Sequence, residues 1–141
     1  MTQNWLISKV KQWPTAKLLP YARNARTHSQ AQVGQIAASV KGFGFNNPIL
    51  AGADGVIIAG HGRQAAAQHL SLEPVPVIVL DHLSASQRRA LVLADNRIAA
   101  NAGWDEELLK LEIAELDDIM AAMSAKRRTR IDNRAMQLAT L

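Results

Sequence analysis

The residues whose types and spacing best suit chemistry are Gly60-His61-Gly62-Arg63, which follow an apolar run and precede an alanine-rich stretch. The first turn of a helix presents unpaired backbone N–H groups and a partial positive charge. Glycines there let a phosphate approach, and an arginine adds a bidentate, charge-assisted contact. The segment therefore indicates a phosphate site. A tight strand-to-helix turn with an exposed arginine is the alternative, and taken alone the four residues favour it.

Two further side chains are candidates for acid–base or metal chemistry. His61 could act as a general base, bind a metal or contact a ribose, although a single loop histidine more often does none of these. Asp95, in Asp95-Asn96-Arg97, is the second candidate, and its role depends on the family resemblance given below. The alternative for this second segment is the C-terminal cap region of a helix.

Short strands must position these residues. The turn Gly52-Ala53-Asp54-Gly55 separates two apolar runs rich in β-branched residues and predicts a hairpin. Pro76, within the last apolar run, favours an edge strand or the beginning of a strand. The predicted strands cover residues 7–13, 48–51, 56–59 and 75–80.

Helices are predicted between and after the strands. Ser29 is a plausible N-cap, and Gly42 and Gly44 end the helical spacing that follows it. Ser84 and Gln87 match a capping box. The predicted helices cover residues 29–40, 64–70, 84–97 and 104–116, which completes an α/β arrangement of one domain.

Composition narrows the class of protein. The 141 residues include no cysteine, which excludes disulfides, thiolate metal sites and a cysteine nucleophile. The N-terminus lacks the features of a secretory signal and no apolar stretch is long enough to cross a bilayer, so we expect a cytoplasmic protein without membrane contact.

The net charge is +4, yet residues 1–125 hold 11 basic and 11 acidic side chains. The excess lies in the tail, where Lys126, Arg127 and Arg128 are candidates for phosphate or DNA contacts, although short basic tails are more often simply solvated.

Three segments in order resemble the ParB/sulfiredoxin superfamily, over roughly Leu18 to Asp105. They are Gly44-Phe45-Asn46-Asn47-Pro48-Ile49, Ala59-Gly60-His61-Gly62-Arg63-Gln64-Ala65-Ala66-Ala67 and Ala94-Asp95-Asn96-Arg97. Asn47 stands where the family usually has glutamine.

This resemblance implies an α+β fold of the ParB/sulfiredoxin type, a small mixed sheet flanked by helices. It implies a domain over residues 1–116, followed by a helical extension and basic tail at 117–141. It also implies a bound nucleoside triphosphate, CTP or ATP, with Mg²⁺ at Asp95. The nucleotide-binding residues would be Asn47, Gly60, His61, Gly62, Arg63 and Asn96, and Arg23 and Arg26 resemble an early element near the nucleotide or the DNA.

The same comparison separates branches of the superfamily. Sulfiredoxin needs a cysteine where this chain has His61-Gly62, so peroxiredoxin repair is excluded. Nothing after Trp104 is long enough for both a helix-turn-helix and a dimerisation segment. Residues 83–87 and 99–105 resemble instead the ParB-like domains fused to DNA methyltransferases of phages and mobile elements, without the methylating domain itself.

We therefore expect a nucleotide-binding module with a DNA-associated role in plasmid or phage DNA partition or modification. The alternative is an enzyme, either a ParB-like nuclease or a nucleotide-dependent phosphotransferase, with Asp95 and His61 as catalytic candidates. Nucleases generally need clustered carboxylates, whereas residues 18–104 contain only Asp54, Glu73, Asp81 and Asp95. The nucleotide, DNA and a second copy of the chain are the candidate partners.

Overall fold

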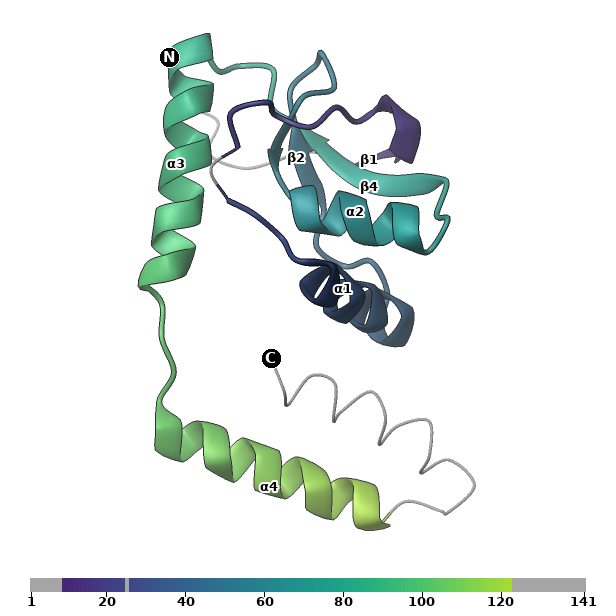
Figure 1. Cartoon of the computed structure of the whole chain (residues 1–141), viewed down its shortest axis with the longest axis vertical. Coiled ribbons are helices and arrows are strands. Elements are labelled where there is room, and N and C mark those ends of the chain that lie inside the picture. Colours follow the sequence, from purple (N-terminus) through teal and green to yellow (C-terminus); the bar gives the residue numbers. More distant parts are fainter. Residues whose placement is uncertain (1–8, 25, 123–141) are drawn as a thin grey trace. The chain divides into compact units, whose positions relative to one another are not determined.

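The computed structural model describes residues 9–24 and 26–122, the side chains of 118–122 excepted. Figure 1 shows a mixed sheet with helices beside it. The chain divides into two units, Met1–Ile98 and Ala99–Leu141. The boundary that the sequence placed at residue 116 stays a prediction, and the site described below lies wholly within the first unit.

Four strands form the sheet in the order β1-β4-β2-β3. Strand β2 pairs antiparallel with β3, which confirms the hairpin, and parallel with β4, while β1 pairs antiparallel with β4. The small mixed sheet flanked by helices is therefore confirmed. The strands are β1 (Lys11–Pro14), β2 (Ile49–Ala51), β3 (Ile57–Ala59) and β4 (Pro74–Val79).

Of the two positions expected for Pro76, the edge strand is wrong, because β4 is an inner strand. Pro76 does lie near the beginning of β4, which starts at Pro74. Pro76 pairs with Gln12 of β1, but the ladder to β2 begins one residue later, where Val77 pairs with Ile49. The proline thus precedes the part of β4 that has neighbours on both sides. Its missing N–H removes no bond from the β2 ladder.

The outer side of β3 is covered by residues that follow the short 3-10 helix η1 (Thr15–Lys17). Leu19 donates its N–H to the carbonyl of Gly55 at 2.8 Å and accepts from the N–H of Ile57 at 2.9 Å. This isolated bridge is parallel and pairs Leu19 with Val56. A loop segment therefore supplies the hydrogen bonds that a fifth strand would make.

Two of the helices begin at the caps that the sequence predicted. The Ser29 side chain accepts from the N–H of Gln32 at 3.1 Å, and Ser84 and Gln87 bond reciprocally at 2.9 and 3.2 Å. Gly44, with φ 93°, ends the first helix. The helices are α1 (Gln30–Phe43), α2 (His61–His69), α3 (Ala85–Asn101) and α4 (Glu106–Ala122).

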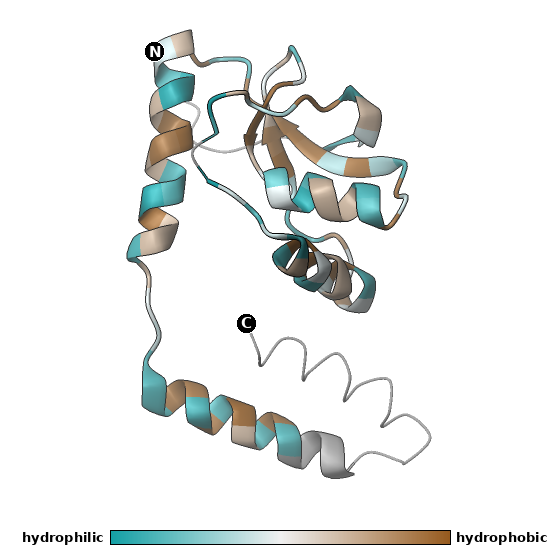
Figure 2. Cartoon of the chain, viewed as in Figure 1, coloured by the Kyte–Doolittle hydropathy of each residue, from teal (hydrophilic) through white to brown (hydrophobic). Residues whose placement is uncertain are grey.

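The core lies between the sheet and α2. Helix α2 packs on β2 and η1, and α1 packs against α2. Burial alternates along β4, where Val75 and Val77 point inward, as expected for a strand with one face on a core. Figure 2 shows the strands as the hydrophobic centre of this unit. The largest fully buried side chains are Ile49, Ile57, Val75 and Val77.

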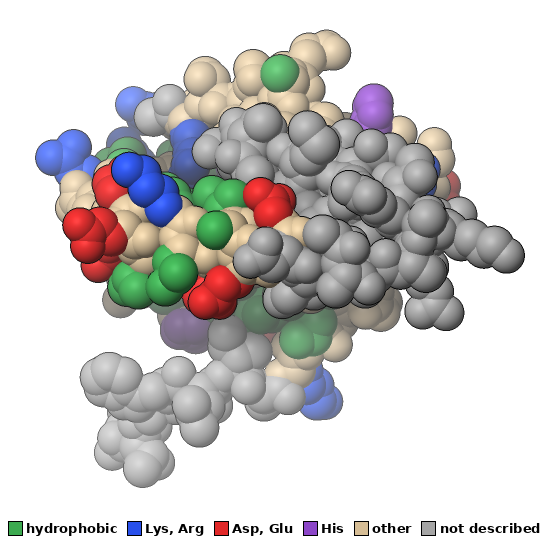
Figure 3. Space-filling view, turned by 90° about the horizontal axis from the view of Figure 1, so that it is seen from below, with side chains coloured by type: hydrophobic (Ala, Val, Ile, Leu, Met, Phe, Trp, Pro, Cys, Tyr) green, Lys and Arg blue, Asp and Glu red, His purple; other side chains and the backbone are tan. Residues whose placement is uncertain are grey.

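Helix α4, in the second unit, mixes acidic and leucine side chains. Asp105 begins it by accepting from the N–H groups of Glu107 and Leu108, both at 3.1 Å. In Figure 3 its described part shows hydrophobic side chains between acidic ones. Among the described residues, no helix has the length and apolar character to span a membrane. The basic residues Lys126, Arg127 and Arg128 lie outside the described residues.

Candidate functional site

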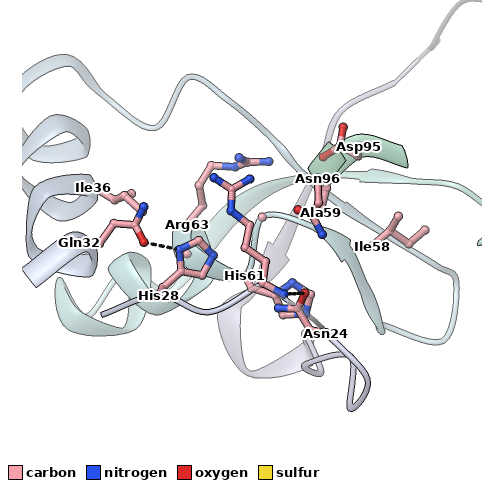
Figure 4. A pocket seen from close by; sticks show the side chains of 13 residues that line it. Asn24, His28, Gln32, Ile36, Ile58, Ala59, His61, Arg63, Asp95 and Asn96 are labelled. Carbon is pink, nitrogen blue, oxygen red and sulfur yellow. Dashed lines mark hydrogen bonds between the residues drawn. The ribbon is translucent and has the colours of Figure 1, made fainter. Parts of the chain in front are cut away.

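The start of α2 opens onto a cavity of about 200 Å³ in the first unit. Four parts of the chain meet there: the loop before α1, α1 itself, the end of β3 with the first turn of α2, and the middle of α3. Figure 4 shows Gln32 and His28 on one side and Asp95 and Asn96 on the other. The lining residues are Asn24, Arg26, His28, Gln32, Ile36, Ile58, Ala59, Gly60, His61, Gly62, Arg63, Asp95 and Asn96.

The two glycines of the turn are there for different reasons. Gly60 is the N-cap of α2 with φ 108° and ψ 25°, a left-handed conformation that favours glycine. Gly62 is buried within the first turn, and a Cβ there would lie 2.8 Å from the Cδ1 of Ile36 and 3.0 Å from the Cε1 of His28. Gly60 therefore turns the chain, and Gly62 lets α1 and the loop before it approach the helix.

Arg63 is the half-buried cation of the cavity. Its Nη2 donates to the carbonyl of Pro48 at 3.0 Å. Its Nε is buried and finds no hydrogen-bond partner within the described part of the chain. Burial lowers the pKa of Arg63, and the charge of Asp95 partly opposes that shift. A buried donor without a partner carries a desolvation penalty that an anionic ligand would relieve.

His61 occupies the first position of α2. Its Nε2 accepts a hydrogen bond from the backbone N–H of Tyr21 at 3.0 Å. A backbone N–H can only donate, so the neutral ring carries its proton on Nδ1. Burial lowers the pKa of His61, and the neighbouring His28 adds to that shift. The ring is therefore held neutral, with one nitrogen committed to the loop.

Acid is expected to destabilise the domain through His61. Between its lowered folded-state pKa and its unfolded value of about 6.5, the unfolded chain binds more protons. This contribution to stability is thus fully present above about pH 6.5 and is lost as the pH falls toward the lower value. Urea unfolding from about pH 5 to 7.5 measures it. His61→Gln should flatten the slope and His69→Gln, exposed on the same helix, should not; an unchanged slope in His61→Gln contradicts the assignment.

Asp95 and Asn96 bring α3 to the cavity. Asp95 is the one carboxylate in the lining, and the described residues contain no group of three or more histidine, cysteine or acidic side chains that could hold a metal by themselves. One carboxylate and one amide oxygen suit Mg²⁺ only if the ligand supplies further oxygens. A metal here would be bound together with phosphates.

The structure gathers most of the site residues that the sequence indicated. Arg26 and both segments around Arg63 and Asp95 line the cavity, whereas Asn47 and Arg23 are outside the lining. Sequence reasoning missed Asn24, His28 and Gln32. His28 Nδ1 lies 2.8 Å from the Oε1 of Gln32, so these two side chains form a polar pair where α1 begins.

Comparison with known proteins identifies the family of the chain. A model of the ParB N-terminal domain matches residues 5–97. The chain belongs to the ParB N-terminal domain family. The ParB-like nuclease domain-containing protein YnaK of Escherichia coli K12 is 51% identical over 81 residues, which are 57% of this chain and 93% of that protein. Both findings confirm the resemblance drawn from the three segments.

Solved structures of ParB domains share the fold. The C-terminally truncated chromosome-partitioning protein ParB of Caulobacter crescentus, complexed with CTP-γ-S, superposes with a TM-score of 0.71 at 20% identity, covering 92% of this chain and 72% of that one. A Pnob8-like ParB-N domain gives 0.55 at 18% identity, over 86% of this chain and 50% of that one. At these identities the likeness concerns the ParB fold alone.

Proposed function

We propose that this ParB-type domain binds the phosphates of a nucleoside triphosphate, CTP or ATP, at the first turn of α2. The observation that carries the proposal is Arg63, a half-buried cation whose Nε has no partner in the described chain and which lines the cavity. The N-terminus of α2 adds unpaired N–H groups and a partial positive charge to the same place. The complex of Caulobacter ParB with CTP-γ-S supports a nucleotide as the ligand.

The residues around the first turn of α2 have distinct roles in this proposal. Gly60 and Gly62 let the phosphates approach the backbone, and Arg63 and Arg26 neutralise them. The Nδ1–H of His61 donates to the ligand, because Nε2 is occupied by Tyr21. Arg23 stays a proposed nucleotide or DNA contact, and Asn47 stays a proposed nucleotide contact, from the family resemblance.

Mg²⁺ would enter with the nucleotide. Asp95 and the amide oxygen of Asn96 would hold it, and the metal would supply charge neutralisation for the phosphates. The residues fit such a role, since they line the same cavity as Arg63.

We propose a DNA-associated setting for this binding, in partition or modification of plasmid or phage DNA. The Caulobacter relative is a chromosome-partitioning protein, which supports the setting. Lys126, Arg127 and Arg128 are proposed DNA contacts within the helical extension and basic tail proposed for residues 117–141. The same proposal includes a relationship to the ParB-like domains fused to DNA methyltransferases. It also includes self-association of the chain and a cytoplasmic location.

The alternative is DNA cleavage, which the name of the YnaK relative favours. The cavity offers Asp95 as its one carboxylate, and His61 could serve as a general base only if its Nε2 were released from the N–H of Tyr21. Incubation with supercoiled plasmid and Mg²⁺ tests this alternative. Nicking that disappears in both Asp95→Ala and His61→Gln would support it over a binding module.

Nucleotide binding is expected to raise the melting temperature of the domain. A ligand at about 100 times its Kd stabilises the folded state by about 2.7 kcal/mol, which for this size is a rise of several degrees. Thermal unfolding with CTP, ATP, GTP and UTP, each with Mg²⁺ and with EDTA, measures the effect. The absence of a shift with all four nucleotides contradicts the proposed function.

A further inference from the structure

An ion pair joins α3 to the β2–β3 turn at a distance from the cavity. The Arg88 guanidinium donates through Nη1 to Oδ2 of Asp54 at 3.0 Å and through Nη2 to Oδ1 at 2.9 Å. This bidentate contact lowers the pKa of Asp54. The Asp54 carboxylate also accepts from the N–H of Val56 at 3.0 Å, which fixes it within the turn.

The turn has a place for the guanidinium. A Cβ built on Gly52 would fall 1.3 Å from the Nη2 of Arg88, so the arginine lies directly over this glycine. The Asp54 carboxylate binds the guanidinium of Arg88, and the missing side chain of Gly52 leaves the space that the guanidinium occupies. The contact is therefore specific to the turn rather than a chance meeting of two surface side chains.

Helix α3 belongs to the first unit as far as Ile98, and it makes few other contacts with the rest of that unit. Of its residues, all of which are described, Val92 is the one buried side chain, at 3% exposure. Leu93 and Ile98 are 62% and 70% exposed. A helix held by so little apolar burial depends more than usual on each polar contact.

The spacing connects the ion pair to the cavity. Arg88, Val92 and Asp95 are at positions i, i+4 and i+7 and so lie along one face of α3. Asn96 follows at i+8. Arg88 holds the first part of this face on the hairpin turn, and Asp95 meets the cavity roughly 10 Å further along the axis. Fixing Arg88 fixes both the rotation of the helix and the direction in which Asp95 points.

We propose that Arg88 is a positioning residue: its ion pair with Asp54 holds α3 so that Asp95 and Asn96 reach the metal–nucleotide complex. The inference rests on the proposed function, because it assigns the helix a share of that same site. Loss of the ion pair weakens only the part of binding that requires Mg²⁺. Binding through the glycine turn and Arg63 is independent of it.

Calorimetric titration of the full chain with the nucleotide that binds, with Mg²⁺ and with EDTA, separates the two parts. Arg88→Ala and Asp54→Ala are each expected to weaken Mg²⁺-nucleotide binding about two- to fivefold, the range for an exposed ion pair. Binding in EDTA stays unchanged. Arg89→Ala, an exposed neighbour on the same helix, is the matched control and leaves both affinities unchanged.

Two further variants exclude a general loss of structure. Arg88→Lys keeps a positive charge at this position of α3 but not the bidentate fork, so its Mg²⁺-dependent affinity should fall between those of Arg88→Ala and the native protein. In an Asp95→Ala/Asn96→Ala background, Arg88→Ala should weaken binding no further, because both side chains that it positions are gone. An equal loss with and without Mg²⁺, or a further loss in that background, overturns the inference.

Hydrogen exchange of the ligand-free chain tests the positioning itself. Arg88→Ala is expected to speed amide exchange in α3 and leave α2 unchanged; unchanged protection of α3 overturns the inference whatever the ligand. If the unaltered protein binds no nucleotide, the proposed function fails and this inference with it. Nucleotide binding that is insensitive to both single variants overturns this inference alone.

Discussion

Arg63→Ala is expected to weaken nucleoside triphosphate binding about 10- to 100-fold and to leave the melting temperature of the unliganded domain within about 2 °C. A hydrogen bond to a charged group contributes about 1.5–3 kcal/mol, which corresponds to this loss of affinity. The unliganded domain loses one bond, to the carbonyl of Pro48, and is relieved of a buried Nε without a partner in the described chain. The lost hydrogen bond lowers the stability of the unliganded domain and the removal of the unpaired donor raises it, so the net change in melting temperature is small.

Isothermal titration with the nucleotide and thermal unfolding without it measure the two effects separately. Arg89→Ala removes the same charge from an exposed position on α3 and should leave binding unchanged. Arg63→Lys keeps the charge but not the fork of donors, so its affinity should fall between those of the alanine variant and the native protein. If the Arg63→Ala variant bound the nucleotide with the native affinity, the assignment of the phosphate site to the first turn of α2 would be wrong.

Gly55→Ala is expected to lower the free energy of unfolding by about 2–4 kcal/mol, because it combines backbone strain with overpacking. Gly55 has φ +86°, and a Cβ there would lie 2.6 Å from the backbone carbonyl oxygen of Lys17. That carbonyl cannot easily retreat, since the neighbouring Leu19 is bonded to the carbonyl of Gly55 and to the N–H of Ile57. The added methyl group must therefore separate η1 from the hairpin.

Gly34→Ala is the matched control for this change. Gly34 lies within α1, and a Cβ there would meet nothing within 4 Å. Its replacement should raise stability by about 0.5–1 kcal/mol, because alanine loses less conformational freedom in a helix. Urea denaturation of both variants gives the comparison. A Gly55→Ala protein as stable as the native chain would show that the turn relaxes without loss.

Local features of the fold could be predicted because their causes are local. Ser29 and the Ser84–Gln87 box cap helices through neighbouring N–H groups, and the turn at residues 52–55 fixes the hairpin. The order of the strands depends instead on which segments meet across the chain. Pairing of β1 with β4 leaves no trace in either segment, so the sequence alone left Pro76 either on an edge strand or at the beginning of a strand.

In the site, too, residues that belong to a local pattern could be predicted, whereas residues brought in by contacts between distant segments could not. Gly60 and Arg63 could be found because a glycine turn before a helix has its own pattern, and Asp95 was found through the family resemblance. His28 and Gln32 reach the cavity because α1 packs against α2 above Gly62, a contact between distant segments. The available signal was position alone: His28 directly precedes the N-cap Ser29.

The bridge between Leu19 and Val56 bears on how the chain behaves among other copies of itself. Strand β3 is short and apolar, and an open strand of this kind is a template onto which another chain can add. The N–H of Ile57 and the carbonyl of Gly55 are already bonded to Leu19. A segment of the domain's own loop thereby occupies these two groups, which are then no longer open to β-pairing with another chain.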